Sequence, residues 1–360
     1  MNQIECAFFN ALQHKFADRQ LRKELFTILT IDEWNALYDL SREQGVLAII
    51  FSALKEISID IPAQIRLKWA YATELIENRY ERQLTLANEV CEEFSKHKIK
   101  TVVLKGFALS KYYPTPKHRE CGDFDCYLLG AFEQGNAIAK KLGANVRFDD
   151  YKHSHINYKG LMIENHKFCS AIRGPKSNKE FEKFIQLLLI ENEYGVSPLN
   201  KHSMYYPSPT FNALFILRHS MVHFLYEGIK VRHLLDWACL INKEKENINW
   251  GIVEDWCNRL NLHNFIAILN EITYKYLGIE PPIIYSTISD ATIHTFITNT
   301  LYSKTSIYNQ KHSSVWTQRY SILKNLILNK WKFDEVYQKS LFKELLKIGA
   351  AAIFEKHPKL

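Results

Sequence analysis

The stretch IKTVVLKGFALSKYYPTPKHRECGDFDCYLL, residues 99–129, contains two segments with the composition of buried strands. The first, residues 99–106, is rich in β-branched residues and ends at Gly106, after which apolar residues return to helical spacing. A loop rich in proline and charge separates it from the second strand, residues 123–129. Two strands joined by a short helix and a loop indicate the start of a small α/β core.

The core continues with a helix and more strands. Helical spacing over residues 131–143 ends at Gly143, and short alternating segments follow at 145–148, 153–158 and 161–168. The remaining chain shows helical periodicity. We therefore predict an α+β protein that is mostly helical overall, with one small mixed sheet. Its expected regions are an N-terminal helical region, an α/β core and a C-terminal helical domain, at residues 1–97, 98–200 and 201–360.

Composition places the chain among ordinary globular proteins. It has 360 residues, of which 47% are hydrophobic and 24% charged. The N-terminus lacks the basic and apolar pattern of a secretion signal, and no apolar run is long enough for a membrane helix. The seven cysteines form no C-x-x-C pair. A cytoplasmic protein with no membrane partner is expected.

The net charge of +7 is concentrated at one end of the chain. Residues 311–360 contain ten Lys or Arg and four Asp or Glu, which gives +6 for that segment. Lysine-rich amphipathic helices are usually solvated surfaces, and this interpretation is preferred. Binding of nucleic acid through these basic helices remains the alternative.

Two carboxylates stand out in the second strand. If residues 123–129 are extended, Asp123 and Asp125 point to one face, while Phe124 and Cys126 point into the core. Two acids on one face can converge on divalent metal ions. Mg²⁺ is the expected ion because carboxylate oxygens, water and substrate phosphates suit it, with Mn²⁺ as the alternative.

The surroundings of these acids indicate a phosphate-binding site. Gly106 allows close backbone approach where strand passes to helix, and Lys105 would add a positive charge. Arg119 could contact phosphate or pair with a carboxylate. A third acid, Glu164, shares one strand face with His166. Together they predict a combined metal and phosphate site.

These motifs resemble a known superfamily. A glycine after a strand, then Asp123-Phe124-Asp125-Cys126, then Glu164 on a later strand is similar to the DNA polymerase beta-like nucleotidyltransferases. More narrowly, VVLKGFALSKYYP, GDFDCYLL, IENH and VRHLLDWACLI resemble a bacterial family of uncharacterised nucleotidyltransferases. The likeness extends over most of the chain, and it implies a nucleotidyltransferase core within the predicted fold.

The resemblance implies metal-dependent transfer of a nucleoside monophosphate from an NTP to an acceptor hydroxyl or phosphate, releasing pyrophosphate. Asp123 and Asp125 would hold the metals, and Glu164 would bind metal and orient or deprotonate the acceptor. The superfamily usually has Gly-Ser at the turn, where this chain has Lys105 and Gly106. Lys105 and Arg119 are therefore the expected substitutes for holding the triphosphate.

Histidines in two places are further candidates. On the C-terminal side, His219 and His223 are spaced as neighbours on one helix, and Arg232 follows on the next. We expect His223 and Arg232 to line the cleft opposite the acids; a zinc pair and an intrahelical Arg232–Asp236 ion pair are the alternatives. His153 and His155 could line the acceptor site, although a surface position is favoured for His155.

Three functions remain open from the sequence. The first is an active nucleotidyltransferase whose acceptor is a small molecule rather than RNA or protein. The second is a toxin-like enzyme that extends tRNA ends through the basic C-terminal helices. The third is a degenerate nucleotidyltransferase fold that binds a nucleotide or a protein without catalysis.

Overall fold

The computed structural model describes residues 1–149, 151–190, 196–198, 204–282, 288–302 and 323–346. The helices before and within the sheet region are α1 (Gln3–Ala17), α2 (Glu24–Thr27), α3 (Ile31–Glu43), α4 (Leu47–Glu56), α5 (Ala63–Lys96), α6 (Gly106–Ser110), η1 (Pro116–His118), α7 (Phe132–Lys141) and α8 (Lys176–Ile190). The later helices are α9 (Pro209–Tyr226), α10 (Val231–Glu244), η2 (Lys245–Asn247), α11 (Trp250–Leu260), α12 (His263–Lys275), α13 (Asp290–Tyr302) and η3 (Lys332–Tyr337). The strands are β1 (Thr101–Val103), β2 (Phe124–Tyr127), β3 (Asn145–Arg147), β4 (His153–Tyr158), β5 (Leu161–His166), β6 (Val196–Pro198) and β7 (Met204–Pro207).

All seven strands form one mixed sheet with the order β3-β4-β5-β2-β1-β7-β6. Strand β2 lies between β1, which runs antiparallel to it, and β5, which runs parallel. Strand β4 pairs antiparallel with β5, and β7 pairs parallel with β1. The centre of the sheet therefore brings together three strands that are well separated in sequence.

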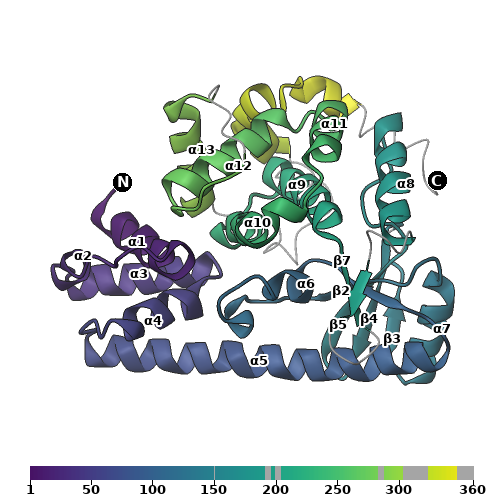
Figure 1. Ribbon diagram of the computed structural model, residues 1–360, viewed down its shortest axis with the longest axis horizontal. Helices are drawn as coiled ribbons and strands as arrows, with labels where there is room; N and C mark the ends of the chain where they lie inside the picture. The colour runs from purple at the N-terminus through teal and green to yellow at the C-terminus, as the bar shows by residue number, and fades with distance from the viewer. Residues whose placement is uncertain (150, 191–195, 199–203, 283–287, 303–322, 347–360) are drawn as a thin grey trace.

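One face of the sheet packs against two helices. The C-terminal half of α5 contributes Leu86, Val90 and Phe94 to a buried cluster, and α7 contributes Ile138 and Ala139. In Figure 1, the long helix α5 runs from the N-terminal helices to the region beneath the strands. This arrangement leaves the other face of the central strands available for polar side chains.

The two helical regions share a second, larger core. Phe8 and Trp69 from the N-terminal helices belong to the same buried cluster as Trp237 and Phe265 from the C-terminal helices. Gln44, which follows α3, reaches across this junction: its amide nitrogen donates to the carbonyl of Leu301, and its amide oxygen accepts from the backbone of α10. Parts of the chain that are distant in sequence therefore pack as one body.

The prediction of a mostly helical α+β protein with a small mixed sheet is confirmed. The sequence did not predict β6 and β7, which are only three and four residues long and each contain proline. Strand β7 extends the sheet beyond residue 200, so the sheet includes a strand from the region predicted to be C-terminal. The boundaries proposed for the three regions stay predictions.

About half of the basic C-terminal segment lies outside the described residues, since 311–322 and 347–360 are not among them. Within the part that is described, Lys332 is 2% exposed and its ammonium stands 4.9 Å from the centre of the Phe224 ring. One of the ten basic residues is thus packed into the core. Among the described helices, none combines the length and apolarity needed to span a membrane.

Candidate active site

The central strands carry acids on the face opposite to the α5 and α7 core. Phe124 and Cys126 are buried in that core, so the alternation of β2 turns Asp125 to the other face. The parallel register of β2 and β5 places Asp125 beside Glu164. Asp123 lies just before β2 and is exposed. The predicted alternation of this strand is therefore confirmed, and the third acid lies on the adjacent strand.

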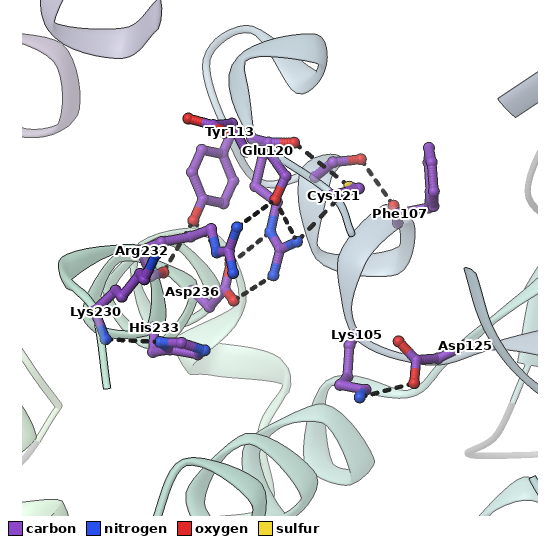
Figure 2. A network of polar contacts seen from close by, with 12 residues as sticks. Lys105, Phe107, Tyr113, Glu120, Cys121, Asp125, Lys230, Arg232, His233 and Asp236 are labelled. Atoms are coloured by element: carbon purple, nitrogen blue, oxygen red, sulfur yellow. Dashed lines mark hydrogen bonds and ion pairs between the residues drawn. The ribbon is translucent and has the colours of Figure 1, made fainter. Parts of the chain in front are cut away.

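His166 connects Asp125 to Glu164. Its Nε2 is 3.0 Å from Asp125 Oδ1 and 3.3 Å from Glu164 Oε2, and its side chain is fully buried. On the other side of Asp125, the Lys105 ammonium is 2.7 Å from the same Oδ1. Figure 2 shows the contact between Lys105 and Asp125. Asp125 is thus held by one ammonium and one imidazole.

The charges of the site shift the pKa values of its acids in opposite directions. Burial alone would raise the pKa of Asp125, but the Lys105 ammonium and the His166 hydrogen bond hold it well below its usual range. Burial raises the pKa of Asp123, and the nearby charges of Glu164 and Asp125 raise it further. Three acids that repel one another form a site that a divalent cation would stabilise.

The backbone at Lys105 is strained. Lys105 has φ of 47° and ψ of −143°, a combination that glycine tolerates far better than residues with a Cβ atom. Gly106 is not among the residues with positive φ. A Cβ atom on Gly106 would approach its nearest neighbours, Arg119 and Cys121, no closer than 3.7 Å. The unusual backbone at this turn therefore belongs to the lysine and not to the glycine that follows it.

Two substitutions at Lys105 isolate this strain. Lys105→Gly and Lys105→Ala both remove the ammonium and differ only by a Cβ atom. We expect the glycine variant to be more stable to urea by about 1 to 2 kcal/mol, the reverse of the usual order in ordered structure. Equal stabilities, or a more stable alanine variant, would show that the backbone at this position is relaxed.

The acids face a cleft whose opposite wall comes from α9 and α10. Lys105, Gly106, Asp123 and Asp125 form the sheet side of this cleft. The helical side consists of residues from α9 and α10: Phe215, Ile216, His219, Ser220, His223, Arg232, His233 and Asp236. The structure therefore brings Asp123, Asp125, Lys105, Gly106, Arg119, His223 and Arg232 to one cleft, whereas Glu164 does not line it. Glu164 joins them through its contacts with His166.

A buried polar network fastens α10 to the loop before β2. Arg119 Nε and Nη2 donate to the two carboxylate oxygens of Asp236 at 3.1 and 2.7 Å, and the Tyr113 hydroxyl donates to the same carboxylate at 2.7 Å. Arg232 Nη1 donates to the Glu120 carbonyl at 3.0 Å. Figure 2 shows Tyr113, Arg232 and Asp236 converging at this junction. Asp236 is paired with Arg119 and not, as one alternative had it, with Arg232.

The histidines of the helical wall form a row. The ring centres of His219 and His223 are 4.3 Å apart, and those of His223 and His233 are 6.2 Å apart. His223 Nδ1 lies 2.6 Å from the carboxylate of Glu227. Burial lowers the pKa of His219 and His233 well below the usual value, so both are neutral at pH 7.

The described side chains that could bind a metal lie on the sheet and not in the histidine row. Among the described residues, two groups of three side chains bring their ligand atoms within 4.8 Å of one another: Asp125, Glu164 and His166, and His153, His155 and Glu164. Both groups lie on the sheet, and neither includes the His219–His223 pair. Asp123 lines the cleft but belongs to neither group.

Three histidines of the sheet lie beside the acids; the sequence placed His166 on the face of Glu164 and gave His153 and His155 as candidates for the acceptor site. His166 contacts both acids, while His153 and His155 face Glu164 from β4. His155, for which a surface position was favoured, is 24% exposed and lies 3.8 Å from Glu164. The sequence showed the alternation within each of the segments that form β4 and β5, but it did not show the register in which these two strands pair.

Comparison with known proteins agrees with this geometry. Residues 31–278 match the family described as uncharacterised nucleotidyltransferase. No curated protein and no solved structure matches the chain. The matched region contains the sheet, the three acids, and the two helices that form the opposite wall of the cleft. The chain therefore belongs to the family of uncharacterised nucleotidyltransferases.

Proposed function

We propose that the protein is an active, metal-dependent nucleotidyltransferase. It transfers a nucleoside monophosphate from an NTP to an acceptor hydroxyl or phosphate, and it releases pyrophosphate. One observation carries the proposal: Asp125 and Glu164 are register neighbours on β2 and β5, with Asp123 beside them at the cleft. Two acids at one cleft with a third on the adjacent strand form the kind of site that phosphoryl and nucleotidyl transfer uses.

The donor atoms fit a hard dication. Asp123, Asp125 and Glu164 offer carboxylate oxygens, which Mg²⁺ prefers, with Mn²⁺ as the alternative. Burial and the nearby charges of Glu164 and Asp125 raise the pKa of Asp123, so a cation bound at these oxygens would favour its charged form. When bound, the metal would neutralise the developing charge of the transferred phosphoryl group. Asp123, Asp125 and Glu164 would hold it.

Lys105 is suited to hold phosphate. Its side chain is 21% exposed at the cleft and its ammonium contacts Asp125, so it can be released when a cation takes over that carboxylate. Arg232 also lines the cleft, and burial together with the nearby Arg119 lowers its pKa. Because the Arg232 charge is disfavoured beside Arg119, a bound anion such as phosphate would stabilise it. Arg119 is committed to Asp236 and would act by positioning the loop before β2.

The acceptor is proposed to be a small molecule. The histidine row on α9 and α10 faces the acids across the cleft, and the neutral imidazoles of His219 and His233 can donate hydrogen bonds to hydroxyl groups or accept them. Glu164 would orient or deprotonate the attacking group. An RNA acceptor would need the basic C-terminal residues, half of which lie outside the described part of the chain.

A thermal-shift panel tests the donor and the metal together. The four NTPs are added separately, with and without Mg²⁺, and the melting temperature of the full chain is measured. A ligand present at about 100 times its Kd adds about 2.7 kcal/mol to the free energy of unfolding. We expect one NTP to raise the melting temperature only when Mg²⁺ is present.

Matched variants show whether the acids are responsible. Asp123→Asn/Asp125→Asn should lose the metal-dependent shift, whereas Asp32→Asn/Asp255→Asn makes the same chemical change at two exposed positions and should keep it. If no nucleotide shifts the wild type, or if the first variant keeps the shift, the proposed nucleotide and metal site is wrong. Binding that persists without any pyrophosphate release would favour the degenerate binding module.

A further inference from the structure

A second group of ligand atoms lies beside the carboxylate pair. His153 and His155 occupy one face of β4, and the antiparallel register puts them opposite His166 and Glu164 on β5. The Nε2 atoms of His153 and His155 are 3.3 Å apart. Their distances to Glu164 Oε1 are 3.7 and 3.8 Å. Three ligand atoms of mixed type therefore form a nearly equilateral triangle.

The size of this triangle fits a bound metal. For metal–ligand bonds of about 2.1 Å, two ligands of a tetrahedral site stand about 3.4 Å apart. The three observed edges, 3.3, 3.7 and 3.8 Å, lie close to that spacing without movement of the backbone. Both imidazoles turn Nε2 toward the common centre, as ligation through Nε2 requires.

The Nδ1 atoms of His153 and His155, which point away from the triangle, affect how well the two rings can bind a metal. A histidine that binds metal through Nε2 carries its proton on Nδ1, and a carboxylate near Nδ1 commonly orients the ring. Asp149 Oδ2 lies 3.3 Å from Nδ1 of His155. Nδ1 of His153 and Nδ1 of His155 are both buried without a hydrogen bond among the described residues, so Asp149 lies behind His155 at ion-pair distance only. Nε2 of His153 lies 3.3 Å from Nε2 of His155.

We propose that His153, His155 and Glu164 bind one imidazole-preferring transition-metal dication, such as Zn²⁺, next to the oxygen-rich Mg²⁺ site. Imidazole ligands favour such ions over Mg²⁺. The two oxygens of Glu164 face different groups: Oε1 faces His153 and His155, and Oε2 faces His166. One carboxylate can therefore serve both sites. A metal at the imidazole site would fix the position of Glu164.

The wild type provides the first test, with Co²⁺ as the probe because its visible bands report on coordination. The full chain is stripped with a chelator and titrated with Co²⁺ in the presence of excess Mg²⁺ and without nucleotide. We expect one Co²⁺ per chain with the intense bands of four- or five-fold coordination, displaced by Zn²⁺ and not by Mg²⁺. Weak octahedral bands that excess Mg²⁺ removes would overturn the proposal.

Paired variants locate the metal. His153→Asn/His155→Gln should lose the intense bands. The matched control, His219→Gln/His223→Gln, removes two imidazoles from the opposite wall of the cleft and should retain them. Asp149→Asn should weaken Co²⁺ binding by about 10- to 100-fold, because it removes only the carboxylate behind His155. Loss of the bands in the α9 control, but not in the sheet variant, would place the metal elsewhere and contradict the inference.

This inference does not depend on the proposed transfer. Co²⁺ binding is measured without nucleotide, whereas the thermal-shift panel measures Mg²⁺-dependent nucleotide binding. A chain that binds Co²⁺ at His153 and His155 but no nucleotide would support the metal site and contradict the transferase. The reverse result would leave the transferase standing and remove the imidazole site.

Discussion

Asp125→Asn is expected to reduce nucleotidyl transfer by about 10³-fold or more while the chain stays folded. The substitution keeps the size of the side chain and removes the negative charge. A carboxylate that holds the metal contributes several kcal/mol of transition-state stabilisation, and about 4 kcal/mol corresponds to roughly 10³ in rate. The measurement is pyrophosphate release from the NTP that gives the metal-dependent thermal shift, with a low-molecular-weight extract as the source of acceptor.

The comparison needs a control for stability, because Asp125 also contributes to folding. Its pKa is lower in the folded chain than in the unfolded chain, so its charge stabilises the fold above the ordinary pKa of about 3.9 and loses this effect as the pH falls below that value. At neutral pH the variant should therefore melt at a lower temperature. Assays are run below both melting temperatures, beside Asp255→Asn, which changes an exposed acid. Full activity in Asp125→Asn would exclude Asp125 from catalysis.

The acids were predictable from the sequence because strand alternation is a local property. Within residues 123–126, polar and apolar residues alternate, and the structure turns Asp125 away from the buried Phe124 and Cys126. Glu164 followed from the same rule applied to β5. The prediction of a mostly helical protein with a small sheet likewise depended on periodicity within single segments.

The contacts between different strands and helices could not be predicted, because they depend on which segments become neighbours in the fold. Alternation placed Glu164 and His166 on one face of their own strand, but only the β4–β5–β2 order shows that His166 contacts Asp125 and that His155 faces Glu164. Arg119 and Asp236 are 117 residues apart in the chain. A pairing at this separation leaves no local signal, so the sequence offered Arg232, four residues from Asp236, as the partner instead.

Lys105 shows another limit. The family resemblance implies glycine chemistry at the turn after β1, and the sequence places that role on Gly106. In the structure the backbone with positive φ belongs to Lys105, whose ammonium contacts Asp125. Backbone strain of this kind persists where the surrounding structure determines it, and it is concentrated at functional sites. A positive φ cannot be predicted from the presence of a lysine, because residues with a Cβ atom rarely adopt it.

Asp236→Ala is expected to destabilise the chain by about 3 to 5 kcal/mol. The side chains of Arg119 and Asp236 are only 7% and 5% exposed, and Asp236 accepts both guanidinium hydrogen bonds and one from Tyr113. Removing the carboxylate leaves the Arg119 charge buried without its partner, and such losses are usually of this size. The free energy of unfolding is measured with urea at neutral pH.

An ion pair of similar length but different burial gives the matched control. Arg259 and Glu180 approach to 2.6 Å, yet their side chains are 40% and 37% exposed. Glu180→Ala should therefore cost no more than about 1 kcal/mol. The double variant Arg119→Met/Asp236→Leu should recover much of the stability lost in Asp236→Ala, because it removes the unpaired charge as well as its partner. The outcome that would contradict this is a double variant whose loss of stability equals the sum of the losses from the single substitutions at Arg119 and Asp236. The two charges would then not stabilise one another. The link between α10 and the loop before β2 would depend instead on Tyr113 and the surrounding apolar packing.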